Sequence, residues 1–241
     1  MTHAELIRKI DEAQDRIRDM PCFVVPTSFD PDDPELRAFP RPLQWKWASV
    51  ETTLRAFCSR GIVMRLPLFW QIEPALFAAG QAVGTPIFVN DQGNMPVGAA
   101  AIRTANMDTV VTDSQDAFKF SSYLLEAGAQ FPDAWIIVHP VSRNEWTIPA
   151  PLQNSTAHVA QEVHIFPGVP FLEQCEKLAA KKELVFHLSE PYRLEMEGDA
   201  TYLTSAADDP LPLLRYELPI TLVRGEQCLC GKRMVARVEE S

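Results

Sequence analysis

The sequence predicts an α/β fold in which a mostly parallel sheet layer with helices is followed by a small antiparallel β-barrel or meander. Up to residue 138, apolar strand-like segments alternate with helical segments of about 10 residues, as in a parallel sheet covered by helices. From Leu184 onward the segments are short, alternate apolar with polar residues and are separated by turn residues, as in antiparallel strands. We expect a boundary near residue 150, with an α/β domain over residues 1–150 and a β-rich subdomain over residues 151–241.

The first sixty residues predict two helices, a short strand and a connector. Apolar residues recur at helical spacing from Ala4 to Met20, which predicts an amphipathic helix that Pro21 ends. A short strand is expected at Phe23–Val25. Proline and aspartate are dense from Pro26 to Pro42, which predicts a surface connector because proline fixes φ and discourages both helix and sheet. A second helix is expected from Ser49, a suitable N-cap, to Ser59.

The rest of the α/β domain combines apolar strands with two capped helices. The expected strands are Gly61–Leu66, Pro86–Val89, Thr109–Val111 and Ala134–Val138. The expected helices are Glu73–Gln81 and Ser114–Ala127. Asp113 or Ser114 can cap the second helix, and Gly128 suits the position just after its end.

The β-rich subdomain begins after a loop at Pro149–Thr156. Glu197-Gly198-Asp199 predicts a hairpin turn between two of its strands. The expected strands are Leu184–Leu188, Tyr192–Met196, Ala200–Thr204, Pro212–Tyr216 and Ile220–Arg224.

Composition and charge exclude several classes of protein. A formal net charge of -10 and a pI near 5.0 argue against nucleic acid and anionic membrane surfaces as partners. No apolar run approaches the roughly 20 residues that span a bilayer, and the N-terminus is not a signal peptide. The five cysteines, an odd number, favour thiols or metal ligands over a disulfide framework. We expect a cytoplasmic protein.

Two segments near the C-terminus carry a family resemblance. Leu211-Pro-Leu-Leu-Arg-Tyr-Glu-Leu-Pro-Ile220 is followed closely by a Cys228-x-Cys230-Gly231 turn. Together they resemble the adenylate-forming (AMP-dependent) ligases, specifically the phenylacetate-CoA ligase branch, in which a P-L-I-R-Y-R-T-G-D segment precedes a C-P-C-G-R turn. Leu184–Glu190 resembles the G-L-H-I-W-E-D strand of that branch, and Tyr202–Ser205 resembles its G-E-L-V-L-T-T strand. The resemblance covers about residues 163–238 and implies the large domain of such a ligase.

Cys175, His187, Cys228 and Cys230 are the predicted metal ligands. Structural zinc takes four ligands from cysteine and histidine, and the Cys-x-Cys-Gly turn presents two sulfurs from one loop. The resemblance adds the histidine of the G-L-H pattern and a cysteine to this set. Four protein ligands leave no position for water, so the zinc would be structural. The alternative is that His187 is a hydrogen-bonded strand histidine and the cysteines are core thiols.

Arg215 and Tyr216 are the candidate cofactor-binding residues. Arginine can bind a phosphate or a carboxylate with two hydrogen bonds. Alternatively, Arg215 forms a structural ion pair with a nearby acid such as Glu217 or Asp209.

The resemblance also implies that ATP is not bound. The ligases hold ATP phosphates with an S-G-T-T-G loop and use a Y-G-x-T-E segment, and neither pattern occurs here. After Arg215-Tyr216 the ligases place T-G-D, whose aspartate binds ribose; here the same positions read Glu217-Leu218-Pro219-Ile220, so a carboxylate there is lost. The sequence also stops just past Arg237, where the family's small domain with its catalytic lysine would begin.

Two functions follow from these observations. The first is a degenerate, truncated ligase relative that no longer adenylates and serves as a binding or assembly subunit. It would pair with a complete ligase or with itself as a homo-oligomer such as a dimer, and bind an apolar carboxylate or an acyl thioester. The second is an active enzyme on a carboxylate or acyl thioester, such as a minimal AMP-forming acyl- or aryl-CoA ligase. The missing patterns favour the first.

Overall fold

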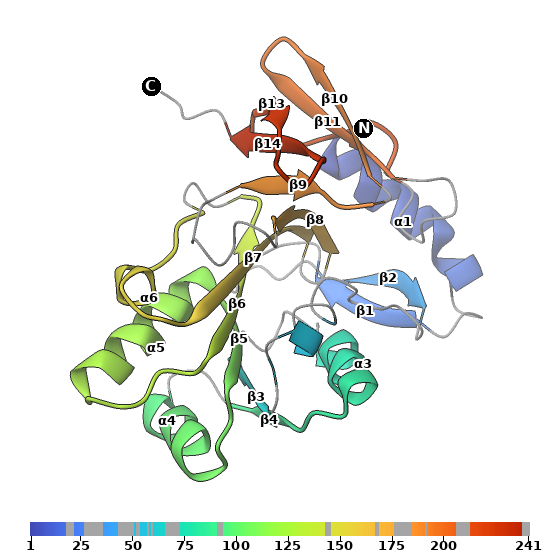
Figure 1. Ribbon diagram of the computed structural model, residues 1–241. Helices are drawn as coiled ribbons and strands as arrows, with labels where there is room; N and C mark the ends of the chain where they lie inside the picture. Colours follow the sequence, from blue (N-terminus) through green and yellow to red (C-terminus); the bar gives the residue numbers. More distant parts are fainter. Residues whose placement is uncertain are drawn as a thin grey trace.

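The computed structural model contains a nine-stranded sheet, helices on its two faces, and two smaller sheets (Figure 1). It describes residues 1–17, 22–26, 36–42, 51, 54–56, 58, 60–65, 73–90, 94–142, 146–166, 169–175, 185–190, 192–205 and 213–237. The helices with assigned bounds are α1 (His3–Ile17), α3 (Glu73–Val83), α4 (Met95–Thr104), α5 (Ser114–Glu126) and α6 (Ala150–Gln153). The strands are β1 (Cys22–Pro26), β2 (Leu36–Pro42), β3 (Ile62–Arg65), β4 (Ile87–Val89), β5 (Thr109–Asp113), β6 (Ala134–Pro140), β7 (His158–Phe166), β8 (Val169–Gln174), β9 (Phe186–Leu188), β10 (Arg193–Glu197), β11 (Ala200–Thr204), β12 (Tyr216–Glu217), β13 (Leu222–Gln227) and β14 (Arg233–Arg237).

One half of the large sheet is parallel. Its strands follow the order β4-β3-β5-β6-β7, and every neighbouring pair in this half is parallel. All residues of β5 and β6 are buried, which explains their apolar sequences, because helices cover both faces. α4, α5 and α6 pack on one face through residues such as Ile102, Phe120 and Leu152. α3 packs on the other face through Leu76 and Ala79.

The other half of the large sheet is antiparallel and continues directly from the first. β7 pairs in parallel with β6 and antiparallel with β8, and the sheet then continues through β9, β14 and β13. β10, β11 and β12 form a separate antiparallel three-stranded sheet. This arrangement confirms the predicted α/β fold class with an antiparallel C-terminal part. The boundary near residue 150 stays a prediction, and strands from both sides of it share the large sheet.

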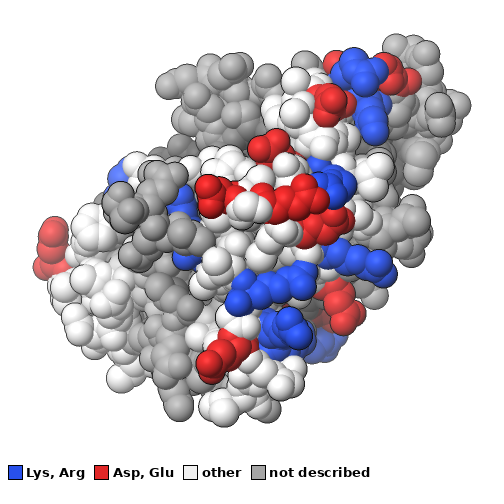
Figure 2. Space-filling view, turned by 90° about the horizontal axis from the view of Figure 1, so that it is seen from above, with Lys and Arg blue, Asp and Glu red and all other residues white. Residues whose placement is uncertain are grey.

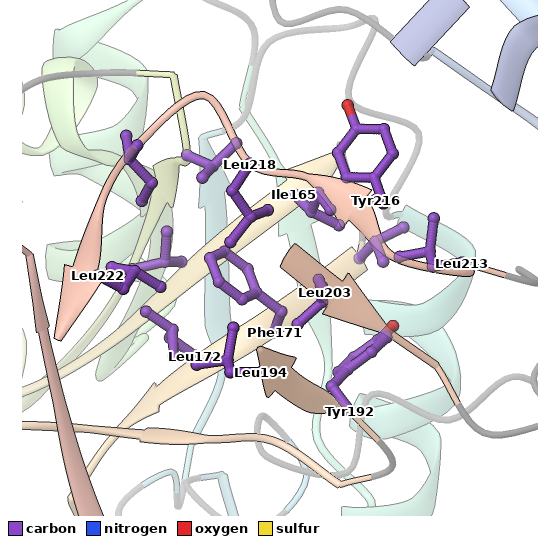
Figure 3. Packing of buried hydrophobic residues seen from close by; sticks show 14 of the residues in the cluster. Ile165, Phe171, Leu172, Tyr192, Leu194, Leu203, Leu213, Tyr216, Leu218 and Leu222 are labelled. Carbon is purple, nitrogen blue, oxygen red and sulfur yellow. The ribbon is translucent and has the colours of Figure 1, made fainter. Parts of the chain in front are cut away.

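The three-stranded sheet packs on the antiparallel half through an apolar cluster (Figure 3). Phe171 and Leu172 of β8 face Leu194 of β10 and Leu203 of β11 in this cluster, and all four side chains are buried. Leu6 of α1 is buried in the same cluster. The N-terminal helix is therefore anchored beside the small sheet, with the start of the chain next to β10 and β11 (Figure 1).

Several predicted elements are confirmed, and one needs correction. The first helix, the strands corresponding to β1, β3 to β6, β9 to β11 and β13, and the helices corresponding to α3 and α5 lie at or near the predicted positions. The predicted connector at Pro26–Pro42 contains the strand β2 instead. Among the described strands, β2 pairs only with β1, so it is an edge strand. Proline is tolerated in an edge strand because the N–H group that it lacks can face away from the partner strand.

Other differences reflect local geometry. The predicted strand Pro212–Tyr216 is reduced to β12 because Arg215 has a φ of 47°, which extended backbone does not allow. α4, β7, β8 and β14 were not predicted, and the predicted loop Pro149–Thr156 contains the short helix α6, where Pro151 is tolerated because the first turn of a helix needs no N–H from it. Most of the helix expected at Ser49–Ser59 lies outside the described residues. No helix within the described ranges has the length and apolar character needed to cross a membrane.

Candidate metal centre

Cys175, His187, Cys228 and Cys230 lie together at the antiparallel end of the large sheet. Cys175 directly follows β8, and its backbone N–H donates to the carbonyl of Val185 at 2.8 Å, which fixes it beside β9. His187 is the middle residue of β9. Cys228 and Cys230 lie in the turn between β13 and β14. Three separate parts of the chain therefore contribute to one cluster.

The distances between the four side chains fit tetrahedral metal coordination. All four potential ligand atoms lie within 4.8 Å of one another. The sulfurs of Cys175 and Cys228 are 3.6 Å apart, and the sulfur of Cys230 is 3.2 Å from Nε2 of His187. Around a tetrahedral zinc with usual bond lengths, two sulfurs lie about 3.8 Å apart and a sulfur and a nitrogen about 3.6 Å apart. The cluster could therefore hold a metal ion with small adjustments of its side chains.

The orientation of His187 suits a metal ligand. Its Nδ1 lies 2.9 Å from the backbone carbonyl oxygen of Arg233. Because a carbonyl only accepts hydrogen bonds, Nδ1 must carry the proton, and the lone pair of Nε2 is then directed at Cys230. Histidines that bind metals commonly make such a second hydrogen bond through the other ring nitrogen.

The β13–β14 turn is built to bring two cysteine sulfurs close together. The N–H of Cys228 donates to the carbonyl of Lys232, and the N–H of Gly231 donates to the carbonyl of Cys228, both at 2.8 Å. Gln227 also donates through its side chain to the carbonyl of Gly231. Gly231 has a φ of 91°, a conformation that residues with a Cβ rarely adopt. The glycine of the motif is thus required by the path of the backbone.

The cluster is shielded from solvent. Cys175, His187 and Cys228 are buried, Cys230 is half-buried, and Val185 and Met234 pack against the cysteines. The four residues would complete a tetrahedral shell and leave no position for a substrate or water. This arrangement suits a structural ion that joins β8, β9 and the β13–β14 hairpin.

Arg215 forms ion pairs within the three-stranded sheet. Its guanidinium forms ion pairs with Glu195 at 2.9 Å and Glu197 at 2.8 Å, and it lies 4.7 Å from the ring centre of Tyr202. The hydrogen bond that Arg215 donates to Glu197 raises the pKa of Arg215 above its usual value. The acids that pair with Arg215 belong to β10, whereas the sequence suggested a nearby acid such as Glu217 or Asp209, of which Asp209 lies outside the described residues.

Tyr216 is enclosed by core residues and by α1. Its hydroxyl lies 3.2 Å from Nδ1 of His3, and its ring makes an edge-to-face contact with Phe166 at 5.7 Å. Burial raises the pKa of Tyr216 to about 12. The next residue in the chain, Glu217, donates its N–H to the carbonyl of Met1. Residues at the start of the chain therefore cover the strand that contains Tyr216.

Two features that shape these sites have no signal in the sequence. One is the carbonyl of Arg233, which orients His187, because a backbone group has no signature in a sequence. The other is the packing of α1 against β12, a contact between opposite ends of the chain. The Cys-x-Cys-Gly turn, by contrast, is local and is visible in the sequence.

Comparisons with known proteins identify the fold. No family model and no curated protein sequence matches the chain. Among solved structures, it is similar to the amide bond synthetase McbA from Marinactinospora thermotolerans, with a TM-score of 0.51 and 10% identity over 78% of this chain and 44% of that one. It is also similar to the o-succinylbenzoate CoA synthetase MenE from Bacillus subtilis, with a TM-score of 0.53 and 10% identity over 81% of this chain and 44% of that one. A malonyl-CoA ligase matches with a TM-score of 0.50 and 14% identity over 88% of this chain and 52% of that one.

These likenesses establish the fold and its extent. The chain has the α/β fold found in these ligases and spans about half their length. At 10–14% identity, the comparison shows that the fold is shared but does not show that the activity is shared.

Proposed function

We propose that this chain is a cytoplasmic, non-adenylating protein with the fold of an acyl- or aryl-CoA ligase, and that it works as a binding or assembly subunit. Within the superfamily, the Cys-x-Cys-Gly turn after Arg215-Tyr216 supports kinship with the phenylacetate-CoA ligase branch. The ligand class is an apolar carboxylate or an acyl thioester, and the protein partner is a complete ligase or a second copy of the chain.

The environment of Arg215–Ile220 carries the proposal. This segment resembles the ligase strand whose aspartate binds ribose, yet Ile220 stands at the position of that aspartate, and both Leu218 and Ile220 are buried in the apolar cluster. The charge of Arg215 is balanced by Glu195 and Glu197. A nucleotide at this place would have to displace these acids and would meet an aliphatic side chain in place of a carboxylate.

Zinc is the proposed ion at the metal centre. Three thiolates and one imidazole are typical ligands of structural zinc, whereas magnesium and calcium prefer oxygen ligands. In the bound state, Cys175, His187, Cys228 and Cys230 would be the ligands. The zinc would hold the β13–β14 hairpin against β8 and β9 and so stabilise the antiparallel half of the sheet.

Calorimetric titration of the purified, metal-loaded protein with Mg-ATP tests the proposal. It is repeated with a panel of aryl and acyl carboxylates and with acyl-CoA thioesters. We expect no heat of binding from Mg-ATP and saturable binding of a carboxylate or thioester. Saturable ATP binding accompanied by release of pyrophosphate would overturn the proposal.

An arginine variant locates any ATP binding that is found. Arg215→Ala should abolish it if the nucleotide occupies the segment that resembles the ligase strand. Arg193→Ala is the matched control, because this exposed arginine lies on β10 of the same small sheet. ATP binding that both variants retain would mean a nucleotide site elsewhere in the chain.

A further inference from the structure

Two sulfurs of the metal centre lie close enough to bond to each other. The sulfur of Cys175 is 3.6 Å from that of Cys228, and none of the four described cysteines is in a disulfide. Disulfide sulfurs are about 2.05 Å apart, so the two atoms would have to approach by about 1.5 Å. Cys175 follows β8 and Cys228 follows β13, so a bond between them would join the same two parts of the chain as a shared metal ion.

The third cysteine of the centre is the one that solvent reaches. Cys230 is half-buried, whereas Cys175 and Cys228 expose only 2% and 6% of their surface. Leu229, which stands between the two cysteines of the turn, exposes 80%. Figure 2 shows the face that carries the β13–β14 hairpin, where acidic and basic side chains are interspersed at the surface. A small polar oxidant dissolved in water therefore meets Cys230 before either buried sulfur.

We propose that the metal centre is also an oxidation site, at which a peroxide converts Cys175 and Cys228 into a disulfide that takes the place of the metal ion. The inference goes beyond the binding role proposed above and uses the same cluster. The two states exclude each other because a thiolate is a metal ligand and a disulfide sulfur is not. Reducing conditions in the cytoplasm favour the thiolates, so the disulfide would form only when oxidant is present.

The chemistry balances in three steps. The Cys230 thiolate attacks one oxygen of hydrogen peroxide, the O–O bond breaks, and a sulfenic acid and hydroxide form. The Cys175 thiolate, within 4.8 Å, attacks the sulfenic sulfur and expels a second hydroxide, which leaves a Cys175–Cys230 disulfide. The Cys228 thiolate then attacks the Cys175 sulfur and releases the Cys230 thiolate. Two thiolates lose two electrons, peroxide gains them, and two protons from solvent convert both hydroxides to water.

The disulfide would keep one link of the centre and remove another. It would hold the β13–β14 turn to the end of β8, as the ion would. β9 contributes only His187 to the cluster, so the connection of β9 through the centre would be lost when the ion leaves.

Peroxide titration of the zinc-loaded chain tests the site. A background with Cys22→Ser and Cys58→Ser leaves the cysteines of the cluster as the only thiols of the chain. One equivalent of hydrogen peroxide should release about one equivalent of zinc to a coloured chelator and remove about two thiols per chain. Mass spectrometry of peptides prepared without reduction should find Cys175 joined to Cys228. Dithiothreitol followed by zinc should restore the metal content.

Two single variants identify the thiol that reacts first. The rate of disulfide formation is measured in reduced, metal-free protein, so that loss of a metal ligand does not affect the comparison. Cys230→Ser should slow the Cys175–Cys228 disulfide at least about tenfold, because peroxide must then reach a buried sulfur. Cys58→Ser is the matched control and should leave the rate unchanged. Cys58 is half-buried like Cys230, but burial raises the pKa of its thiol and it lies outside the cluster.

Four outcomes would overturn the inference. They are zinc that stays bound after oxidation, over-oxidation of Cys230 without a disulfide, a disulfide between two molecules, and equal rates for the wild type and Cys230→Ser. Elemental analysis before oxidation separates this test from the proposed zinc. A reduced chain without zinc would contradict the ion, whereas peptide mapping would still decide whether Cys175 and Cys228 become joined. The ATP titration tests adenylation independently of both.

Discussion

The imidazole of His187 illustrates how a single side chain is prepared for its role. The carbonyl of Arg233 fixes its tautomer, and β9 holds its Nε2 beside the sulfur of Cys230. The side chain therefore needs little reordering to bind an ion, which reduces the entropic cost of binding. Zinc should bind tightly for the same reason, because its ligands are already close to their final positions.

The cysteines give a direct test of the metal centre. Cys228→Ser should reduce the zinc content from about one equivalent per chain to near zero and lower the free energy of unfolding by more than about 4 kcal/mol. Cys58→Ser is the control, since Cys58 is a half-buried free thiol near Asp108, away from the cluster. It should retain the metal. Elemental analysis and denaturant unfolding measure both quantities, and equal zinc content in the two variants would contradict the assignment.

Tyr216 should make the protein sensitive to alkaline pH. Burial raises its pKa from 10.0 to about 12, so the folded state disfavours the phenolate. The stabilisation by neutral Tyr216 is complete below pH 10 and is lost as pH rises from 10 to about 12, a change on the order of 3 kcal/mol. Tyr216→Phe should flatten the dependence of unfolding free energy on pH in this range, whereas Tyr123→Phe should not. Identical slopes for the wild type and Tyr216→Phe would show that another group is responsible.

At the scale of elements, the β13–β14 turn depends on Gly231. An added Cβ would meet no atom within 4 Å, so the cost of Gly231→Ala is the backbone strain at a φ of 91°. We expect a loss of about 1–3 kcal/mol in the free energy of unfolding together with weaker zinc binding. Gly128→Ala places a similar strain after α5, where the φ is 59° and space is also open. It should destabilise the protein with unchanged zinc affinity in a competition titration, and a parallel loss of affinity would refute the role of the turn.

The elements that the sequence did not predict share a physical cause. In β7, the buried polar residues Gln161, Glu162 and His164 interrupt the apolar pattern of a central strand. They are accommodated because Gln161 is hydrogen-bonded to His139 and Glu162 is hydrogen-bonded to His164. These hydrogen bonds form only in the folded chain. α4 contains Pro96 and Gly98, which suggest a loop, but a Cβ at Gly98 would lie 2.6 Å from the Asn90 side chain and 3.0 Å from that of Phe120. The glycine therefore permits close packing and does not mark a break.

The metal centre likewise combines a part that is local in the sequence with a part that only the folded sheet brings together. Cys228, Cys230 and Gly231 form a local turn, and this part could be predicted from the sequence. The position of Cys175 beside His187 depends on the register between β8 and β9, in which Gln174 pairs with Phe186. Residues 176–184 lie between the two ligands in sequence, so their proximity is a property of the sheet and not of the spacing.

For the molecule as a whole, metal removal should affect the two halves of the large sheet differently. The four candidate metal ligands lie at the antiparallel end, whereas β5 and β6 are buried in the parallel half. After chelation, hydrogen exchange should accelerate in β9, β13 and β14 while β5 and β6 remain protected. Readdition of zinc should restore the protection. Uniform loss of protection would instead mean that the sheet unfolds as a single cooperative unit.

The order of strands in the large sheet also affects how the protein is made. β4 pairs on the outer side of β3, after which β5, β6, β7, β8 and β9 follow one another on the other side of β3, each beside a strand already made, and the β13–β14 hairpin comes last at that end. A chain leaving the ribosome can therefore extend the sheet in the order of synthesis. Cys175 and His187 are in place before Cys228 and Cys230 emerge, so an ion bound by all four residues would be captured late, when the β13–β14 hairpin joins the sheet.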